Sequence, residues 1–136
     1  MQRLFDDPDV DVERRKRVLP VRGAYQVSDA VIVLSTQESF CRVVTEAMAN
    51  GLPVVASDLE PIVDLLGAGG EGAAGLVCPV GDVDGFATAV RRLVEDDALR
   101  ARLGARGIER AAAYHHDGIR KLWRDEIDAA LGSPDA

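Results

Sequence analysis

The stretch Ala30-Val-Ile-Val-Leu34 decides the fold of this 136-residue chain. It is an unbroken apolar run rich in β-branched residues, and such a run predicts a β-strand that is covered on both faces. Strands of this kind belong to parallel sheets flanked by helices. Two further short apolar runs, residues 53–56 and 75–78, repeat the pattern along the chain. We therefore predict a small parallel sheet.

Helices are predicted between and after these strands. Asp82 is a candidate N-cap for the helix with the clearest periodicity. In the helix expected at residues 97–112, Gly104 and Gly107 each weaken helix formation by up to about 1 kcal/mol relative to alanine. Further helices are expected at residues 20–29, 41–50, 62–66 and 117–131. Strands that alternate with helices indicate right-handed βαβ units, and hence one Rossmann-like α/β domain that takes up residues 1–136.

Two of these helices have apolar stripes that identify the predicted core. In the helix at residues 41–50 the stripe consists of Val43, Val44, Ala47 and Met48. In the helix after Asp82 it consists of Val83, Phe86, Ala87, Val90, Leu93 and Val94.

Composition and charge exclude several classes of protein. Sixteen Lys and Arg against twenty-three Asp and Glu leave a net charge of −7, which argues against nucleic acid or an anionic membrane as a partner. The apolar runs are too short for a membrane span, and the N-terminus lacks a secretory pattern, so we expect a cytoplasmic protein. Cys41 and Cys78 are expected to be reduced and packed, and we expect neither a metal nor a cofactor.

The first residues are the least informative. Residues 1–18 change from acidic to basic, and the basic run at 14–17 is interpreted as a solvated surface. A short strand near 10–12 or 17–19 is predicted. The glycines of Gly67-Ala-Gly-Gly-Glu-Gly72 match the letters of a dinucleotide-binding motif, but they follow a helix and lead into a strand, so we interpret them as a connector.

The segment Glu38-Ser-Phe-Cys-Arg-Val-Val-Thr-Glu46 carries the candidate chemistry. It follows the first strand and opens a helix, where unpaired amides and the helix dipole favour an anion. The amides near Phe40, Cys41 and Arg42 are the predicted donors, and the Arg42 side chain adds charge. Glu38 and Glu46 flank this turn, and carboxylates can accept hydrogen bonds from the vicinal hydroxyls of sugars. On spacing alone, we favour the interpretation that Glu38 is a turn residue and Glu46 a solvated helix residue, because two glutamates at this spacing are common by chance.

The neighbouring motifs resemble the retaining nucleotide-sugar glycosyltransferases of the GT-B fold, in the glycosyl transferases group one clan. That family reads Asp-Val-Phe-Val-Leu-Pro-Ser, Glu-Gly-Phe-Gly-Leu-Val and Glu-Ala-Met-Ala-x-Gly-x-Pro-Val-Val-Ala-Ser in its C-terminal, donor-binding domain. The resemblance covers residues 19–131. The matching stretches here are Asp29-Ala-Val-Ile-Val-Leu-Ser35, Glu38-Ser-Phe-Cys-Arg-Val43, Glu46-Ala-Met-Ala-Asn-Gly-Leu-Pro-Val-Val-Ala-Ser57 and Gly75-Leu-Val-Cys-Pro-Val-Gly-Asp82.

The resemblance implies a role for each residue of this segment. Glu38 is the expected catalytic residue and holds hydroxyls of the donor sugar, while Glu46 holds the ribose hydroxyls. The amides of Phe40, Cys41, Arg42 and Val43 bind the diphosphate and the sugar. The reaction implied is transfer of a hexose from a nucleoside-diphosphate sugar with retention of configuration, in carbohydrate biosynthesis.

The chain also departs from the family pattern. Ser39 and Cys41 stand where the family has glycines, and Glu60 and Pro61 replace a pair of glycines further on. By resemblance, the chain lacks the N-terminal domain, so we expect it to be inactive or weak unless an acceptor-binding domain meets it in trans. The alternative function is a non-enzymatic interaction module, or a degenerate remnant, that associates with itself or another chain. A thiol at Cys41 activated by the helix N-terminus is a further hypothesis.

Overall fold

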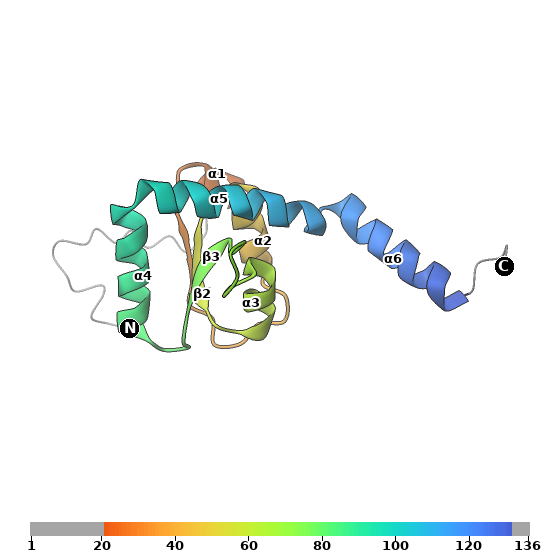
Figure 1. Ribbon diagram of the computed structural model, residues 1–136, viewed down its shortest axis with the longest axis horizontal. Helices are drawn as coiled ribbons and strands as arrows, with labels where there is room; N and C mark the ends of the chain where they lie inside the picture. The colour runs from red at the N-terminus through yellow and green to blue at the C-terminus, as the bar shows by residue number, and fades with distance from the viewer. Residues whose placement is uncertain (1–20, 132–136) are drawn as a thin grey trace.

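The computed structural model describes residues 21–131. Helices and strands alternate along this part of the chain, and the last helices follow one another (Figure 1). The elements are α1 (Val21–Gln26), β1 (Val31–Val33), α2 (Arg42–Ala49), β2 (Val54–Ser57), α3 (Glu60–Leu66), β3 (Gly75–Cys78), α4 (Val83–Glu95), α5 (Asp97–Ala111), the 3₁₀ helix η2 (Ala112–Tyr114) and α6 (His116–Leu131). The predicted α/β class is confirmed; the strand expected near 10–12 or 17–19 and the basic run at 14–17 lie outside the described residues.

The three strands form a parallel sheet in the order β1-β2-β3. Val54 in β2 pairs with Val31 on one side and with Gly75 on the other. All four residues of β2 are buried, as expected for the central strand of a sheet that helices cover on both faces. The predicted parallel sheet is therefore confirmed.

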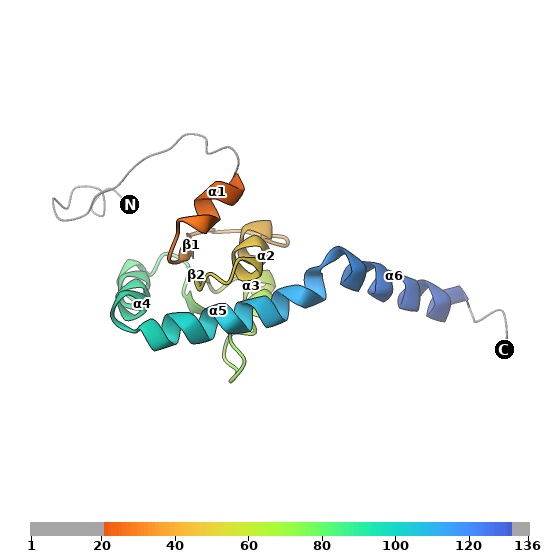
Figure 2. The ribbon, with the colours of Figure 1, turned by 90° about the horizontal axis from the view of Figure 1, so that it is seen from above.

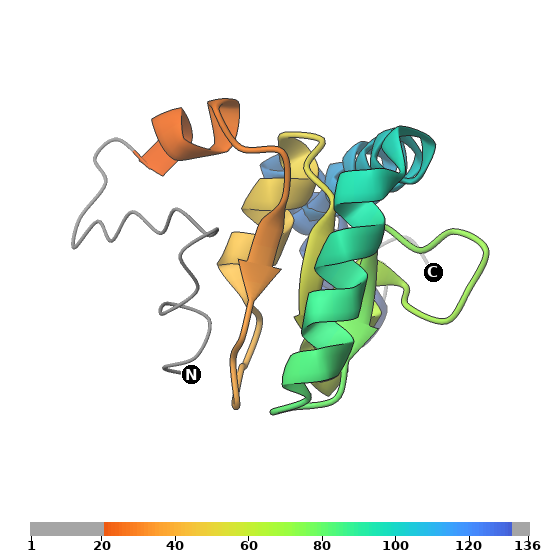
Figure 3. The ribbon, with the colours of Figure 1, turned by 90° about the vertical axis from the view of Figure 1, so that its left-hand side faces the viewer.

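Two apolar layers sandwich the sheet, one on each face. Figure 3 shows α4 in front of the strands, with the other helices behind them. Alternate residues of β2 supply both layers, since Val54 and Ala56 face α2 and α3 whereas Val55 faces α4. The largest fully buried side chains include Met48, Ile62 and Leu66 from the α2 and α3 side. This arrangement leaves the ends of the strands open for loops.

The first strand is less buried than predicted. The apolar run at residues 30–34 was expected to be covered on both faces, but Ile32 is 48% exposed and Leu34 is 53% exposed. The reason is topological: β1 lies at one edge of the sheet that the described residues form, and α4 packs over Val55 and Cys78 on its side of the sheet rather than over Ile32. The prediction of two-sided burial was wrong for this strand.

Helix boundaries and stripes also differ in detail from the predictions. Asp82 does cap α4, because its Oδ1 accepts a hydrogen bond of 2.9 Å from the Gly85 amide. However, Val43, Val83 and Val94, all assigned to the predicted core, are 44%, 54% and 70% exposed. The buried residues of α4 are Phe86, Ala89 and Leu93. The predicted apolar stripes have the correct helical period, but they include residues that lie outside the buried face of each helix.

Helix α5 packs closely on the C-terminal end of α2, and its glycines make this possible. A Cβ on Gly104 would lie 2.2 Å from the carbonyl oxygen of Gly51, and one on Gly107 would lie 3.3 Å from the Cα of Met48. The prediction that these glycines merely weaken the helix was incomplete, because they allow two backbones to approach closely.

A side chain from α5 also caps the C-terminus of α3. Arg110 Nε donates to the Leu65 carbonyl over 2.8 Å, and Arg110 Nη2 donates to the Asp64 carbonyl over 2.7 Å. These bonds satisfy carbonyls at the C-terminus of α3, which have no partner within their own helix. Figure 2 shows α5 running alongside α2 and α3, while α6 continues beyond them and away from the sheet.

Candidate functional site

The candidate site lies where β1 ends and α2 begins. Parallel strands bring their carboxyl ends to one edge of the sheet, so the loops at residues 34–41, 58–59 and 79–82 share that edge. The loops at 58–59 and 79–82 are joined directly, because Asp58 Oδ1 accepts a hydrogen bond of 3.1 Å from the Val80 amide. Glu60 and Pro61, which replace the family's glycines, belong to the first turn of α3.

The turn into α2 depends on an unusual backbone conformation at Cys41. This residue has φ 57° and ψ 71°, and among the described residues it is the only non-glycine with positive φ. The family has glycine at this position by resemblance, and the left-handed backbone gives a physical reason for glycine there. Cys41 keeps the same conformation with a buried side chain.

The turn leaves amide donors free of backbone acceptors. Within residues 21–131, the amides of Phe40 and Cys41 donate to no backbone carbonyl, and the first bond of the new helix runs from the Val44 amide to the Cys41 carbonyl at 3.0 Å. Arg42 and Val43 occupy the first two helical positions, whose amides have no acceptor within the helix. The amides of Phe40, Cys41 and Arg42 are therefore available to an anion, together with the positive end of the α2 dipole, whereas the amide of Val43 lies against the Cys41 thiol.

Glu38 is held by the loop that it belongs to. Ser35 Oγ donates a hydrogen bond of 2.6 Å to Glu38 Oε1, and the pair is partly buried. The bond orients the carboxylate before α2 begins. A carboxylate accepts about four hydrogen bonds, so acceptor sites on Glu38 remain for a polyhydroxylated ligand.

Glu46 has a partner for each of its two oxygens. Tyr25 of α1 donates through its phenol to Oε2 over 3.0 Å, and Arg42 Nη2 lies 3.3 Å from Oε1. The Glu46 side chain is 39% exposed and that of Arg42 is 84% exposed, so this ion pair is a solvated one. Glu46 is not locked in a buried structural ion pair.

Each glutamate also has a titratable neighbour. After burial, the charge of Glu38 contributes to the raised pKa of the Cys41 thiol, and Glu46 contributes to the raised pKa of the Tyr25 phenol. Burial first, and then the hydrogen bond to Glu46, raise the pKa of Tyr25 to about 12. The polar cluster of the turn thus consists of Ser35 with Glu38, and of Tyr25 and Arg42 with Glu46.

The thiol of Cys41 is less acidic than the helix N-terminus alone would make it. Burial raises its pKa, hydrogen bonds from the Val44 and Val43 amides oppose this effect, and the nearby charge of Glu38 raises the pKa further. The hypothesis of an activated thiol was therefore wrong. Cys41 and Cys78 are both free and buried, as predicted.

The remaining predicted site residues lie at the surface of the turn. Phe40 is 43% exposed, and its ring meets that of Tyr114 edge to face with centroids 6.0 Å apart, which joins the turn to η2. The side chain of Val43 is exposed, so this residue takes part in the turn only through its backbone amide. His115 lies between η2 and α6, with Nδ1 3.8 Å from Asp117 Oδ2, and His116 is the first residue of α6.

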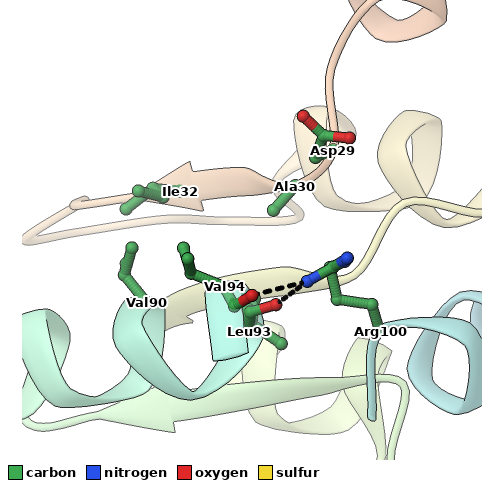
Figure 4. A pocket seen from close by; sticks show the side chains of 7 residues that line it. All are labelled: Asp29, Ala30, Ile32, Val90, Leu93, Val94 and Arg100. Atoms are coloured by element: carbon green, nitrogen blue, oxygen red, sulfur yellow. Dashed lines mark hydrogen bonds between the residues drawn. The ribbon is translucent and has the colours of Figure 1, made fainter. Parts of the chain in front are cut away.

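A separate apolar groove of about 310 Å³ lies on the other face of β1 (Figure 4). Ala30 and Ile32 line one side of this groove, and Val90, Leu93 and Val94 of α4 line the other. Arg100 lies at one end of the groove. It donates hydrogen bonds to the carbonyls of Leu93 and Val94 and so caps the C-terminus of α4. The groove thus lies on the α4 side of the sheet, whereas the glutamates lie with α2.

No helix within residues 21–131 combines the length and the apolar character that a membrane crossing requires. In the same part of the chain, no group of three or more His, Cys, Asp or Glu side chains is arranged to hold a metal ion.

Two residues of the cluster, Tyr25 and Ser35, were missed by the sequence reasoning. Ser35 precedes Glu38 by three residues, and this spacing is a usable signal for a serine that bonds a nearby carboxylate. Tyr25 is 21 residues from Glu46 and meets it through the packing of α1 on α2, so no local pattern reveals that contact.

Residues 20–110 match the family described as Glycosyl transferases group 1. The chain belongs to this family.

Individual relatives extend the comparison. The chain is 48% identical over 77 residues to a phosphatidyl-myo-inositol mannosyltransferase of Mycolicibacterium smegmatis, a match that covers 57% of this chain and 19% of that protein. It is 35% identical over 109 residues to the sulfoquinovosyl transferase SQD2 of Arabidopsis thaliana, covering 79% of this chain and 21% of that protein. The chain thus spans about a fifth of these relatives.

A solved structure has the same arrangement. The sucrose-phosphate synthase of Thermosynechococcus elongatus superposes with a TM-score of 0.64 at 30% identity, over 78% of this chain and 27% of that one. The predicted Rossmann-like domain, half of a GT-B fold, is therefore confirmed as the architecture of this chain.

Proposed function

We propose that this chain is the donor-binding domain of a retaining glycosyltransferase, which transfers a hexose from a nucleoside-diphosphate sugar. One observation carries the proposal: Glu38 and Glu46 flank the amides at the start of α2 that lack a backbone acceptor, and a hydrogen bond holds each carboxylate, from Ser35 to Glu38 and from Tyr25 to Glu46. The names of the relatives support it, because a mannosyltransferase and a sulfoquinovosyl transferase both transfer sugars.

Each part of the turn has a proposed task. The amides from Phe40 to Val43 bind the diphosphate, and the exposed guanidinium of Arg42 adds a charge-assisted bond. Glu46 accepts from the ribose hydroxyls. Glu38 accepts from hydroxyls of the donor sugar and is the proposed catalytic residue, since it contacts the sugar that reacts.

The proposed reaction relies on positioning rather than on a protein nucleophile. The amides and the α2 dipole stabilise the negative charge that grows on the departing diphosphate. The leaving phosphate takes the acceptor proton on the face from which it leaves, so the configuration is retained. Acceptor binding is assigned to a second domain, because residues 21–131 form one α/β unit. The chain assayed alone is accordingly expected to bind donor but to turn it over weakly or not at all.

A thermal-shift screen with UDP-, GDP- and ADP-sugars tests the proposal. A ligand that binds only the folded chain raises the melting temperature by mass action. We expect one nucleotide series to do so, and Glu46→Ala to abolish the shift. Glu109→Ala is a matched control, because Glu109 also pairs with an arginine on an exposed helix, with its Oε2 3.0 Å from Arg106 Nη1. An unchanged shift in Glu46→Ala would contradict the ribose contact.

One observation favours the second candidate, an interaction module that associates with another copy of itself. Within residues 21–131, β1 is an edge strand, and Ile32, Leu34 and Val94 leave apolar surface exposed beside it. Exposed strand edges with apolar neighbours promote pairing between chains. Light scattering separates the two candidates: a stable dimer, insensitive to nucleotide and dissociated by Ile32→Asp, favours the module, whereas a monomer stabilised by nucleotide favours the donor-binding domain.

A further inference from the structure

The two oxygens of Glu46 lie in different surroundings. Oε2 accepts the phenol of Tyr25 in a partly buried contact, whereas Oε1 accepts from Arg42, whose side chain is 84% exposed. The Tyr25 ring packs against the apolar cluster beneath α2, which fixes its position. One oxygen is therefore bonded to an anchored group, and the other to a side chain that a ligand can displace at little cost.

We propose that Tyr25 is a positioning residue for ribose recognition: it holds Glu46 Oε2 so that Oε1 faces the vicinal diol of a ribonucleoside diphosphate. The inference rests on the proposed function, to which it adds the ligand oxygen and the residue that orients it. Tyr25 itself makes no contact with the ligand in this role. Arg42 leaves Oε1 when the ribose arrives and turns to the diphosphate.

Two physical arguments favour this division of tasks. A recognition group is effective when its rotamer is fixed before binding, because less freedom is lost when the ligand arrives. Tyr25 also stays protonated over the whole physiological range, since its pKa lies at about 12, so it remains a hydrogen-bond donor to Glu46. An exposed arginine provides neither a fixed geometry nor a buried contact.

The experiment compares two variants that each remove one partner of the same carboxylate. The full chain, Tyr25→Phe and Arg42→Ala are titrated by calorimetry with UDP, GDP and ADP and with their 2′-deoxy counterparts, which lack the diol. Wild type is expected to prefer the ribonucleotide. Tyr25→Phe is expected to reduce this preference roughly three- to tenfold, the effect of one misplaced hydrogen bond. Arg42→Ala weakens both ligands alike and leaves the ratio unchanged.

The outcomes separate the inference from the proposed function. If Glu46→Ala removes the ribose preference but Tyr25→Phe keeps it, the positioning role is overturned and the proposed function stands. If Arg42→Ala lowers the preference as much as Tyr25→Phe does, the assignment of the two oxygens is overturned. If wild type binds none of these nucleotides, both the proposed function and the inference are overturned.

A second measurement needs no variant at Tyr25. The chain has two tyrosines, so in Tyr114→Phe the remaining phenol can be titrated by its ultraviolet absorbance or by NMR. We expect saturating nucleotide to leave the ionisation midpoint of Tyr25 well above 10, because its bond to Glu46 persists in the complex. A midpoint that falls to about 10 with nucleotide means that the ligand displaces Tyr25, which overturns the positioning role.

Discussion

Tyr25 in α1 and Glu46 in α2 are joined by a hydrogen bond of 3.0 Å between the phenol and Oε2. The bond ties the short first helix to the helix that carries the candidate site. Because the bond and the burial of the ring favour the protonated phenol, the contact affects stability as well as recognition.

Alkaline pH should therefore weaken the wild-type chain through Tyr25. The phenol ionises near 10 when the chain is unfolded and at about 12 when it is folded, so its stabilising contribution is complete below pH 10 and is lost as pH rises toward 12. We expect wild type to lose about 1–2 kcal/mol more than Tyr25→Phe over this interval, since solvent screens the partly exposed pair. Urea unfolding at several pH values measures the difference, and parallel pH profiles would contradict it.

Ser35 is expected to contribute to the binding of the donor sugar and not to the binding of the nucleotide. Its hydroxyl orients Glu38, the residue proposed to hold the donor sugar. Ser35→Ala is expected to weaken binding of the nucleoside-diphosphate sugar roughly three- to tenfold. Binding of the same nucleoside diphosphate without its sugar should not change. Thr45→Ala, which removes a hydroxyl bonded only to the Arg42 carbonyl, serves as control in calorimetric titrations. Equal losses for both ligands would contradict the role of Glu38.

Gly104→Ala should destabilise the fold although alanine favours helices. Its Cβ would lie 2.2 Å from the Gly51 carbonyl oxygen, so α5 has to move away from α2. Overpacking of this kind costs about 1–3 kcal/mol. Gly23→Ala is the matched control, since Gly23 is also helical and a Cβ there meets nothing within 4 Å; it should stabilise by up to about 1 kcal/mol. Thermal unfolding of both variants checks the prediction, and similar melting temperatures would contradict it.

Both cysteines should react slowly with alkylating reagents. Burial raises the pKa of the Cys41 and Cys78 thiols, so little thiolate is present at pH 7.5, and the folded chain shields both sulfurs. We expect iodoacetamide to label the folded chain at least about tenfold more slowly than the chain in urea. Mass spectrometry with Cys78→Ser follows Cys41 alone. Labelling of Cys41 that is faster in the folded chain would restore the hypothesis of an activated thiol.

The sequence was a good guide where the signal is local. The run at residues 75–78 matches β3, and Asp82 caps α4 as predicted, because a short apolar run and an N-cap are properties of a few neighbouring residues. The motifs that suggested the family identified it correctly, and residues 20–110 match its description.

Features that depend on packing between distant parts of the chain could not be predicted from local sequence patterns. Ile32 is exposed because β1 lies at the edge of the described sheet. The sequence of a strand alone does not reveal whether the strand is central or at an edge. The purpose of Gly104 depends on a helix that lies more than fifty residues earlier in the chain. Tyr25 entered the site for the same reason, since its partner is 21 residues away.

The close packing of Gly104 against Gly51 lies at the amino end of the sheet, whereas the turn at Cys41 lies at the carboxyl end. The contacts that fix the relative placement of the helices are thus separated from the side chains proposed to meet the donor. If the turn binds the donor as proposed, we expect changes at Ser39 or Phe40 to affect ligand choice more than the packing of α5 on α2. Evolution can therefore diversify specificity on this domain without having to rebuild it.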